Sequence, residues 1–441
     1  MLGAFLSLLV PQNPIDDLLD VPATRGSVIA ACILRENGEP LYTRNPDQRM
    51  VPASNQKLLT CAFALDVLGP DWRPVTKFWK IGSRIVIDAQ GDPTFTLAQL
   101  REAAKKLGKA SVVEVHQAFR PLIPPSWEYD DLPNRYAAPI TALTVDKGSF
   151  ELWASGGRLT PLPPEFGVRT SVGPSKPGEP RVTYDPLTGK ILVRGPLPMT
   201  KTRLDTLALA RPDLAAARVL GKQVRTVGSV PKTAPTLTLV GPPLKEIVAE
   251  CLTDSINLYA EHLLLLAARK LDPNLSVTRP YERATQLMRD HLAKELSLDR
   301  EALRPDDGSG LSRHNFVTTR TLCRLLQWSK TKPWGADFEA GMVRGGKGTL
   351  AKRLEASSFV GKTGTLDAVV SLTGWVREPS GQTLTMSVIL NHGISSSQDQ
   401  RAVLDQLARF LESPPGGLQS LNIRTIISPY GDGGSHARAE P

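Results

Sequence analysis

Apolar residues recur every three or four positions in several stretches of the chain, which is the spacing of one helix face. One such pattern begins at Ser54 and runs through Leu68. A longer helical pattern covers residues 244–270, and Ser255 and Asn257 stand near its middle, either inside one helix or at a break between two. The same spacing predicts further helices over residues 97–107, 279–296, 318–329 and 397–411.

Short runs rich in apolar and β-branched residues, bounded by turn residues, predict strands near both ends of the chain. Residues 26–34 and 41–43 flank an Asn37-Gly38 turn, which is typical of a hairpin. Paired strands are predicted over residues 359–376, and a further strand over 384–390. These strands alternate with the predicted helices, so the flanking parts of the chain are expected to form a mixed layer structure.

A long block between two predicted helices has a different character. Residues 74 to about 240 form short predicted strands with many prolines, a Pro/Gly-rich stretch over 161–180, and a turn at 185–189 between two strands. With 441 residues the chain also exceeds one typical hydrophobic core. We therefore expect an α/β (α+β) multidomain protein in which one or two β-rich inserted domains interrupt the core.

The chain is basic, because 53 Lys and Arg face 44 Asp and Glu, which gives a net charge of +9 and a pI near 9.4. Such a charge is compatible with solubility alone, or with attraction to an anionic matrix such as a cell wall or membrane surface. No basic run or aromatic-interleaved basic patch stands out, so nucleic acid is not an expected partner.

The ends of the chain and the cysteines indicate the cellular compartment and the kinds of cofactor to expect. Residues 1–10 are apolar but lack a preceding Lys or Arg, which indicates an atypical or truncated export signal. No stretch is long enough for a transmembrane anchor. The four cysteines are scattered in apolar contexts and predict buried free thiols. The sequence lacks His-Glu-x-x-His, a motif typical of zinc-binding helices. We expect no metal and no cofactor; the Gly-rich tail is expected to be flexible.

Three short motifs carry the chemistry, in a fixed chain order: Ser54-Asn55-Gln56-Lys57, Ser255-Ile256-Asn257 and Lys362-Thr363-Gly364. One helical turn places the Ser54 hydroxyl and the Lys57 amine on the same face. This order is typical of active-site-serine enzymes that are acylated by peptide or β-lactam carbonyls. Other Ser-x-x-Lys sequences at 229–232 and 329–332 contain or precede a proline, so they do not fit a helix interior.

The sequence also bears on several alternative functions. Residues 341–347 resemble the start of a phosphate-binding loop, but Gly348 stands where the magnesium-binding hydroxyl belongs. A serine β-lactamase-like hydrolase is the nearest enzymatic alternative, although neither a Glu-x-x-x-Asn nor a Tyr-x-Asn sequence is present. A catalytically silent cell-wall-binding scaffold is the alternative from another class, and the intact motifs argue against it.

The motifs resemble those of the penicillin-recognising serine enzymes. Ser54 and Ser255 lie 201 positions apart, and that long insert resembles the class C low-molecular-mass penicillin-binding proteins. The resemblance extends over residues 25–412 and includes three further segments: Gly91-Asp92-Pro93-Thr94, residues 127–143 beginning Trp-Glu-Tyr-Asp-Asp-Leu, and residues 307–315, Asp-Gly-Ser-Gly-Leu-Ser-Arg-His-Asn. It implies a serine-type D-Ala-D-Ala carboxypeptidase with DD-endopeptidase activity.

The resemblance also implies a fold. The expected core is a transpeptidase/β-lactamase-like, five-stranded antiparallel sheet flanked by helices, with two β-rich domains nested between the first and second motifs. The predicted layout comprises an N-terminal segment (1–24), a discontinuous catalytic core (25–73 and 241–412), an inserted β-rich domain (74–142 and 197–240), a second nested β-rich domain (143–196) and a flexible tail (413–441).

Roles follow for the motif residues. Ser54 is the expected nucleophile, and Lys57 is its base if a neighbouring cation, Lys362, and desolvation keep Lys57 neutral. Ser255 would relay the proton to the leaving D-alanine nitrogen, and Asn257 would hold Lys57 and the substrate amide; taken alone, both would be read as helix-end caps. The backbone N–H groups of Ser54 and Thr365 are expected to stabilise the oxyanion. Lys362, Thr363 and Thr365 are expected to bind the substrate carboxylate. Gly364 is expected to let the substrate backbone approach the strand closely.

The resemblance further implies a pocket for the free amino-acid end of a diaminopimelate side chain. Its expected residues are Asp131, Tyr136 and Arg313, and Asp367 is a further candidate that either favours a cation or faces solvent. Expected partners are peptidoglycan stem peptides, with β-lactams as covalent inhibitors. The expected location is extracytoplasmic, in the periplasm or cell-wall space.

Overall fold

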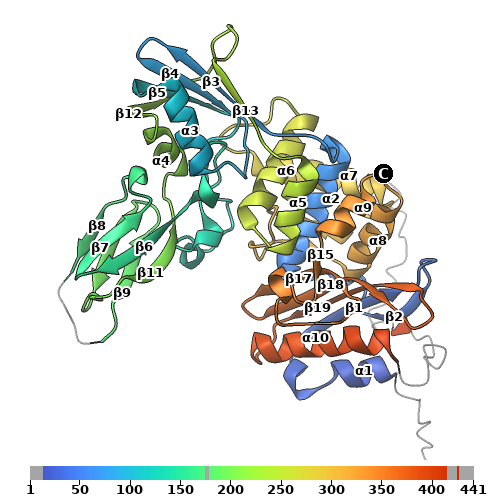
Figure 1. The fold of residues 1–441 in the computed structure, drawn as a ribbon. Helices are drawn as coiled ribbons and strands as arrows, with labels where there is room; N and C mark the ends of the chain where they lie inside the picture. Colours follow the sequence, from blue (N-terminus) through green and yellow to red (C-terminus); the bar gives the residue numbers. More distant parts are fainter. Residues whose placement is uncertain (1–12, 174–177, 415–424, 427–441) are drawn as a thin grey trace, which may run out of the picture.

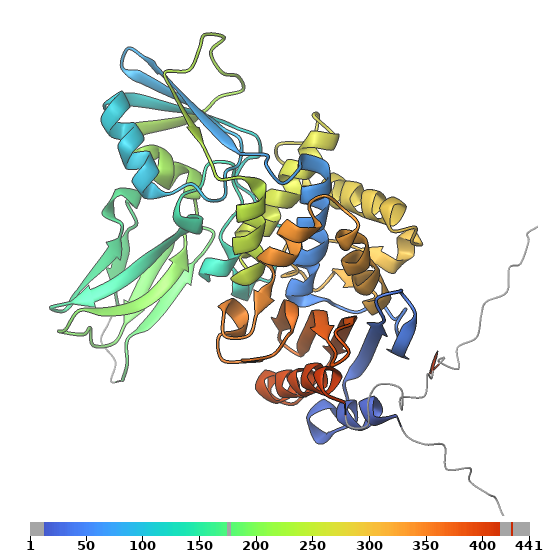
Figure 2. The same ribbon diagram turned by 45° about the vertical axis from the view of Figure 1, so that its right-hand side comes forward.

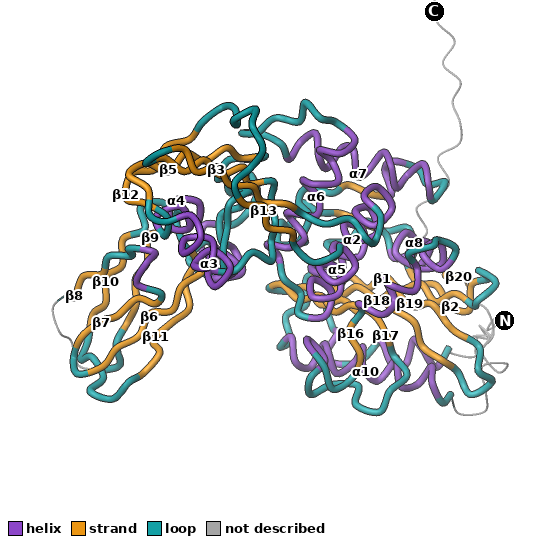
Figure 3. Tube along the Cα trace, turned by 45° about the horizontal axis from the view of Figure 1, so that its top comes forward, coloured by secondary structure: helices purple, strands orange, loops and turns teal. Residues whose placement is uncertain are grey.

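A computed structural model describes residues 13–173, 178–414 and 425–426 of the chain. The predicted export signal lies outside the described residues, as does most of the predicted flexible tail. The elements form two groups of strands on opposite sides of the molecule, with helices between and around them (Figure 3). The first and last parts of the sequence meet in the group that includes β1 and β19 (Figure 1).

The core sheet joins strands from both ends of the sequence. Its order is β16 (Val343–Arg344), β17 (Val360–Leu366), β18 (Val369–Arg377), β19 (Thr383–Asn391), β1 (Val28–Leu34), β2 (Pro40–Arg44) and β20 (Thr425–Ile426). The five longer strands are antiparallel, as expected. The expected number of five strands was nevertheless too small, because β16 and β20 add two-residue edge strands that are too short to show a hydrophobic pattern.

Helices cover both faces of this sheet, which explains why nearly every residue of β18 and β19 is buried. One face packs against α1 (Pro14–Leu19) and α10 (Ser397–Glu412) through side chains such as Leu19 and Leu404 (Figure 2). The other face carries the remaining core helices: α2 (Gln56–Leu68), α5 (Leu244–Thr253), α6 (Asn257–Leu271), α7 (Tyr281–Glu295), α8 (Thr319–Lys330) and α9 (Gly335–Gly341). A small hairpin pairs β14 (Leu303–Arg304) with β15 (Phe316–Val317).

The predicted helices occur close to their expected positions. The long pattern over 244–270 is divided, because α5 ends at Thr253 and α6 begins at Asn257. The expected break is therefore present, and Ser255 lies in it with a left-handed φ of 58°. The expectation of buried free thiols is also confirmed for the four cysteines, Cys32, Cys61, Cys251 and Cys323.

The insert between α2 and α5 contains three separate sheets. A five-stranded sheet has the order β12 (Gly221–Thr226), β5 (Ala110–Gln117), β4 (Arg84–Ala89), β3 (Val75–Ile81) and β13 (Leu237–Val240), and α3 (Leu97–Leu107) connects β4 to β5. A three-stranded sheet joins β11 (Thr202–Ala208), β6 (Ser149–Ser155) and β7 (Arg158–Leu162). Another joins β8 (Thr170–Val172), β10 (Lys190–Arg194) and β9 (Arg181–Asp185), next to α4 (Pro212–Arg218).

Strand pairing in the insert differs from the predicted boundary at residues 196 and 197. β11 lies beyond that boundary, yet it pairs with β6 in register from Thr202–Ala154 to Ala208–Ser149. The sheet of the nested segment thus extends to residue 208. This pairing joins strands about fifty positions apart, and no local pattern in the sequence signals it. The division of the insert into domains stays a prediction.

Candidate active site

Ser54 lies in a short 3-10 turn, Ala53–Asn55, that leads directly into α2. Ala53 has a left-handed φ of 49°, so the turn before the helix is sharp. Lys57 follows one helical turn later, and its Nζ lies 3.0 Å from Ser54 Oγ. The stacking predicted from the Ser-x-x-Lys spacing is therefore present. The Ser54 side chain is half-buried, whereas Lys57 is fully buried.

The Lys57 ammonium group sits among three acceptors. Besides Ser54, its Nζ lies 2.7 Å from Asn257 Oδ1 and 2.7 Å from the Ser309 carbonyl oxygen. Burial lowers the pKa of Lys57 below the ordinary value of 10.5. The sequence predicted that Lys362, as a neighbouring cation, would lower this pKa together with desolvation. Desolvation alone lowers it, because the amine is enclosed by the core and loses its hydration, whereas the nearby carboxyl groups of Asp307 and Glu261 raise it.

Lys362 is the second buried lysine of the site. Its Nζ lies 2.9 Å from Ser255 Oγ and 3.0 Å from the Thr363 carbonyl oxygen. Burial, followed by the charge of Lys57, lowers the pKa of Lys362 to about 7. Two buried ammonium groups repel one another in a low-dielectric interior, so the pair favours a state with at least one neutral amine near neutral pH. A neutral amine is what a general base requires.

The break between α5 and α6 positions the second motif. Ser255 is turned toward Lys362, while Asn257 opens α6 beside Lys57. Asn257 also donates from Nδ2 to the Tyr136 carbonyl oxygen at 3.0 Å. Its amide therefore links the catalytic core to a segment of the insert. Capping does not describe Ser255 and Asn257, because neither side chain caps the end of α5 or the start of α6.

The third motif lies on β17, an inner strand of the sheet. At Gly364 a Cβ atom would lie 2.2 Å from Ser371 Oγ and 2.8 Å from the Pro52 carbonyl oxygen. Glycine is thus required because the strand packs directly against the turn that carries Ser54. Its predicted role in admitting the substrate backbone stays a prediction. Thr363 Oγ1 lies 2.8 Å from Thr349 Oγ1, and Thr365 is exposed beside the cavity described next.

A cavity of about 490 Å³ opens at Ser54 and brings the expected side-chain pocket together with the catalytic motifs. Tyr136 donates from its hydroxyl to Asp131 Oδ1 at 2.7 Å. Arg313 donates to the Asp367 carbonyl oxygen at 2.9 Å, and its guanidinium lies 3.9 Å from the Asp367 carboxylate. The lining residues are Ser54, Glu128, Asp131, Tyr136, Ser255, Asn257, Gly310, Leu311, Arg313, Thr365, Leu366 and Asp367.

Glu128 was missed in the sequence. Its Oε1 accepts from Arg313 Nε at 2.9 Å, and the residue lines the same cavity as Asp131. The signal that pointed to it was its place in the Trp-Glu-Tyr-Asp-Asp-Leu segment, three positions before Asp131. With Glu128 included, the cavity holds three carboxylates and one guanidinium. It therefore favours a ligand that carries a cationic group.

A buried network behind Lys57 was also missed. Asp307 accepts backbone N–H bonds from Gly310 at 2.7 Å and Ser312 at 2.8 Å. Glu261, one helical turn after Asn257 on α6, accepts from the N–H of Gly308 and of Ser309. Burial raises the pKa of Glu261 to about 8. These two carboxyl groups hold the loop whose Ser309 carbonyl oxygen contacts Lys57. The four-residue spacing from Asn257 was the available signal.

Neither a metal centre nor a membrane helix is found in the part of the chain that the structure describes. No group of three or more His, Cys, Asp or Glu side chains is arranged there to hold a metal ion. None of the described helices is long and apolar enough to cross a membrane.

Known proteins with the same organisation identify the family. The model of the D-Ala-D-Ala carboxypeptidase 3 (S13) family matches residues 12–413. The D-alanyl-D-alanine carboxypeptidase of Actinomadura sp. (strain R39) is 26% identical over 94% of this chain and 87% of its own length. The penicillin-sensitive carboxypeptidase A of Dictyostelium discoideum is 24% identical over 88% of this chain and 87% of its own length.

Solved structures agree on the fold. Penicillin binding protein 4 from Haemophilus influenzae superposes with a TM-score of 0.76 at 20% identity, covering 91% of this chain and 98% of its own. The same Haemophilus protein complexed with a β-lactam gives a TM-score of 0.73 at 19% identity, over 91% of this chain and 98% of its own. The mixed α/β multidomain fold is therefore shared. This chain belongs to the D-Ala-D-Ala carboxypeptidase 3 (S13) family and is a serine-type D-Ala-D-Ala carboxypeptidase.

Proposed function

We propose that Ser54 is the nucleophile and that Lys57 accepts its proton. Ser54 Oγ attacks the carbonyl carbon of the terminal D-Ala-D-Ala peptide bond, the C–N bond breaks, and free D-alanine leaves with the proton. Water then hydrolyses the acyl ester on Ser54 and regenerates the enzyme. The observation that carries this proposal is the position of the buried Lys57 Nζ, 3.0 Å from Ser54 Oγ, with a lowered pKa.

The neighbouring groups have roles that fit their contacts. Ser255, held 2.9 Å from Lys362 Nζ, passes the proton to the leaving nitrogen. Asn257 orients Lys57 through its 2.7 Å contact and faces the substrate amide. The backbone N–H groups of Ser54 and Thr365 stabilise the oxyanion. Lys362, Thr363 and Thr365 bind the terminal carboxylate of the substrate, and Gly364 leaves room for its backbone.

We assign the cavity beside Ser54 to the side chain of the diaminopimelate residue, which precedes the D-alanine whose carbonyl is attacked. Asp131 and Tyr136 provide acceptors for an ammonium group, and Arg313 provides a donor for a carboxylate. Glu128 and Asp367 increase the negative charge around that ammonium. The substrate class is then a peptidoglycan stem peptide with a free diaminopimelate end, and cross-links between D-alanine and diaminopimelate are the second substrate class proposed for the same site.

The proposal extends to inhibition by β-lactams and to the location of the enzyme. The β-lactam complex of the Haemophilus relative supports covalent inhibition of this chain by the same class of compound. A β-lactam places its strained carbonyl where the peptide carbonyl would lie, so Ser54 opens the ring and keeps the acyl group.

Because peptidoglycan lies outside the cytoplasmic membrane, the enzyme works in the periplasm or cell-wall space.

Labelling with a fluorescent penicillin, followed by peptide mapping, tests the assignment of Ser54. Ser54→Ala is expected to abolish the label and the release of D-alanine while leaving thermal unfolding unchanged. Ser229→Ala is the matched control, because Ser229 is exposed and heads another Ser-x-x-Lys sequence; it should label like the wild type. Undiminished labelling of Ser54→Ala would reject the assignment. A wild-type protein that takes no label would favour the silent scaffold, and rapid release of the label would favour a β-lactamase.

A further inference from the structure

A second cavity lies in the insert, away from Ser54. It has a volume of about 740 Å³, against about 490 Å³ for the cavity at Ser54, and the two share no lining residue. Cavities of several hundred cubic ångströms are typical of small-molecule sites. Its walls are the β8-β10-β9 sheet on one side and residues 209–218, which include α4, on the other. No role in D-Ala-D-Ala hydrolysis accounts for it.

Buried contacts hold the two walls together. Tyr184 on β9 donates from its hydroxyl to the Ala208 carbonyl oxygen at 2.6 Å, and its ring meets Phe150 edge-to-face at 6.3 Å. The turn before β10 rests against the opposite wall, because a Cβ at Gly189 would lie 3.3 Å from the Ala210 Cβ. Phe150 and Phe166 are buried at the base. The cavity is therefore held open by packed side chains.

The charge of the lining is one-sided. It contains four cationic side chains and neither Asp nor Glu. Arg211 is largely neutralised, because its guanidinium makes two bonds, of 3.0 and 2.9 Å, to the Asp213 carboxylate. Arg169, Lys190 and Arg218 form no ion pair with any described residue. Lys190 stands opposite Asp185 in the register of β9 and β10, so its charge is partly compensated. Arg169 and Arg218 remain, and two guanidinium groups at one hollow repel one another unless an anion joins them.

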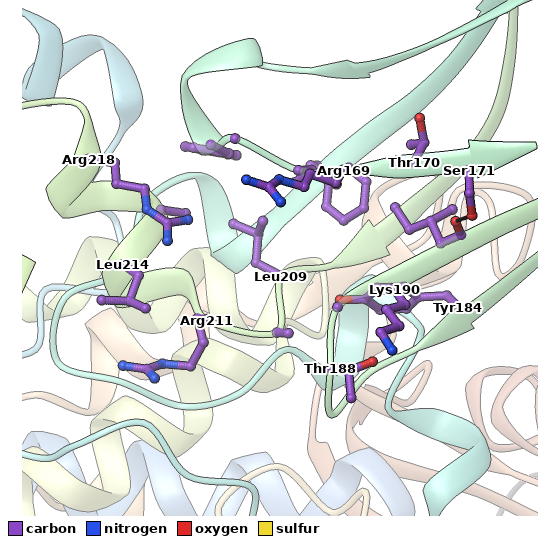
Figure 4. A pocket seen from close by; sticks show the side chains of 18 residues that line it. Arg169, Thr170, Ser171, Tyr184, Thr188, Lys190, Leu209, Arg211, Leu214 and Arg218 are labelled. Atoms are coloured by element: carbon purple, nitrogen blue, oxygen red, sulfur yellow. Dashed lines mark hydrogen bonds between the residues drawn. The ribbon is translucent and has the colours of Figure 1, made fainter. Parts of the chain in front are cut away.

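The positions of Arg169 and Arg218 suit one ligand between them, whereas Lys190 lies apart from both, beside Thr188 (Figure 4). Arg169 stands just before β8, Lys190 begins β10 and Arg218 ends α4, so the three come from separate elements. Figure 4 shows Arg169 and Arg218 pointing toward one another across the hollow. The Arg218 Nη1 lies 3.9 Å from the place that a Cβ at Gly167 would occupy, which sets it beside the segment that carries Arg169.

We propose that this cavity, between the β8-β10-β9 sheet and α4, binds a phosphate group through Arg169 and Arg218. A tetrahedral phosphate offers several acceptor oxygens to cations arriving from different directions, whereas a planar carboxylate is satisfied by one guanidinium. Arg169 and Arg218 are exposed, yet solubility alone does not explain why they face one another, because cations that serve solubility are dispersed over a surface. The phosphate belongs either to a phosphate-bearing polymer or to free inorganic phosphate.

Titration calorimetry of the full chain at low ionic strength tests this proposal. The probes are a glycerol-phosphate hexamer, inorganic phosphate and, as the carboxylate control, hexaglutamate. The double variant Arg169→Gln/Arg218→Gln removes two cations from the cavity. Its matched control is Arg181→Gln/Arg194→Gln, since those two arginines are exposed, lie on the same sheet and are paired across β9 and β10 outside the cavity. Equal thermal unfolding midpoints establish that both variants are folded.

The cavity variant is expected to bind the phosphate probes at least tenfold more weakly than the wild type, and the control variant within twofold of it. Hexamer binding at least tenfold tighter than inorganic phosphate identifies a polymer as the ligand; comparable binding identifies free phosphate, and both results support the site. Three results would overturn the proposal. The first is no phosphate binding by the wild type, and the second is an equal loss of phosphate affinity in both double variants. The third is hexaglutamate binding that is as tight as hexamer binding and is weakened as much by the cavity variant. The assay does not involve Ser54, so its outcome is independent of the proposed catalytic roles.

Discussion

Replacing Lys362 with methionine should make the protein more stable at neutral pH while removing its activity. The methionine side chain has a similar length and no charge. Lys362 is fully buried, and its pKa is lowered to about 7 from an ordinary 10.5. That difference corresponds to a destabilisation of about 4–5 kcal/mol when the amine is charged. Methionine loses the bonds to Ser255 and Thr363, about 1 kcal/mol each. A net stabilisation of about 2–3 kcal/mol remains.

The sign of this effect depends on pH. Between pH 7 and 10.5 the unfolded chain binds a proton at Lys362 that the folded protein does not, so wild-type stability rises with pH across that window. Below pH 7 both states are protonated and the full penalty applies. The stability advantage of Lys362→Met is therefore expected at pH 6–7, and it should disappear or reverse near pH 10.

Guanidinium unfolding midpoints at pH 6, 7, 9 and 10, together with penicillin labelling, measure both parts of the prediction. Lys106→Met is the control, because Lys106 is exposed on α3 and its replacement should change the unfolding free energy by less than about 0.5 kcal/mol at every pH. A Lys362→Met variant that is less stable than the wild type by the same amount at all four pH values would refute the reasoning. That result would mean that Lys362 is buried without an electrostatic cost.

Three further changes test other parts of the site. Lys57→Ala should remove hydrolysis and acylation, measured by D-alanine release and penicillin labelling; acylation near the wild-type rate would move the base role to Ser255. Asp131→Asn should lower kcat/KM about tenfold or more for peptides with a free diaminopimelate end, yet barely change penicillin acylation; equal losses would make Asp131 a structural residue. Gly310→Ala should destabilise the fold by more than about 3 kcal/mol and abolish labelling, since the added Cβ would lie 1.9 Å from a backbone oxygen beside the nucleophile. Gly228→Ala is the control, because a Cβ at Gly228 would lie in open space. A Gly310→Ala variant with wild-type stability and labelling would contradict the packing argument.

Local patterns in the sequence were sufficient for the longer helices and strands of the core and for the three motifs, but not for the two-residue edge strands or for Glu128. Helical spacing after Ser54 predicted α2, and the turn at Asn37-Gly38 predicted the β1-β2 hairpin. The order of the three motifs and the length of the insert indicated the family. Each element and each motif is formed by residues close together in the chain, where backbone propensity and hydrophobic period act directly, and the order of the motifs can be read without knowing which of them meet in space.

What required the tertiary structure is everything that depends on contacts between distant segments. The buried environment that lowers the pKa of Lys57 comes from α6 and from the loop held by Glu261 and Asp307. Glu128 meets Arg313 across 185 positions, and β11 pairs with β6 beyond the predicted boundary. Desolvation and strand pairing are set by which surfaces are brought together, and a one-dimensional pattern of residue types does not contain that information. The sequence by itself determined which groups are available for catalysis, and the fold decided which of them are buried, paired and close enough to react.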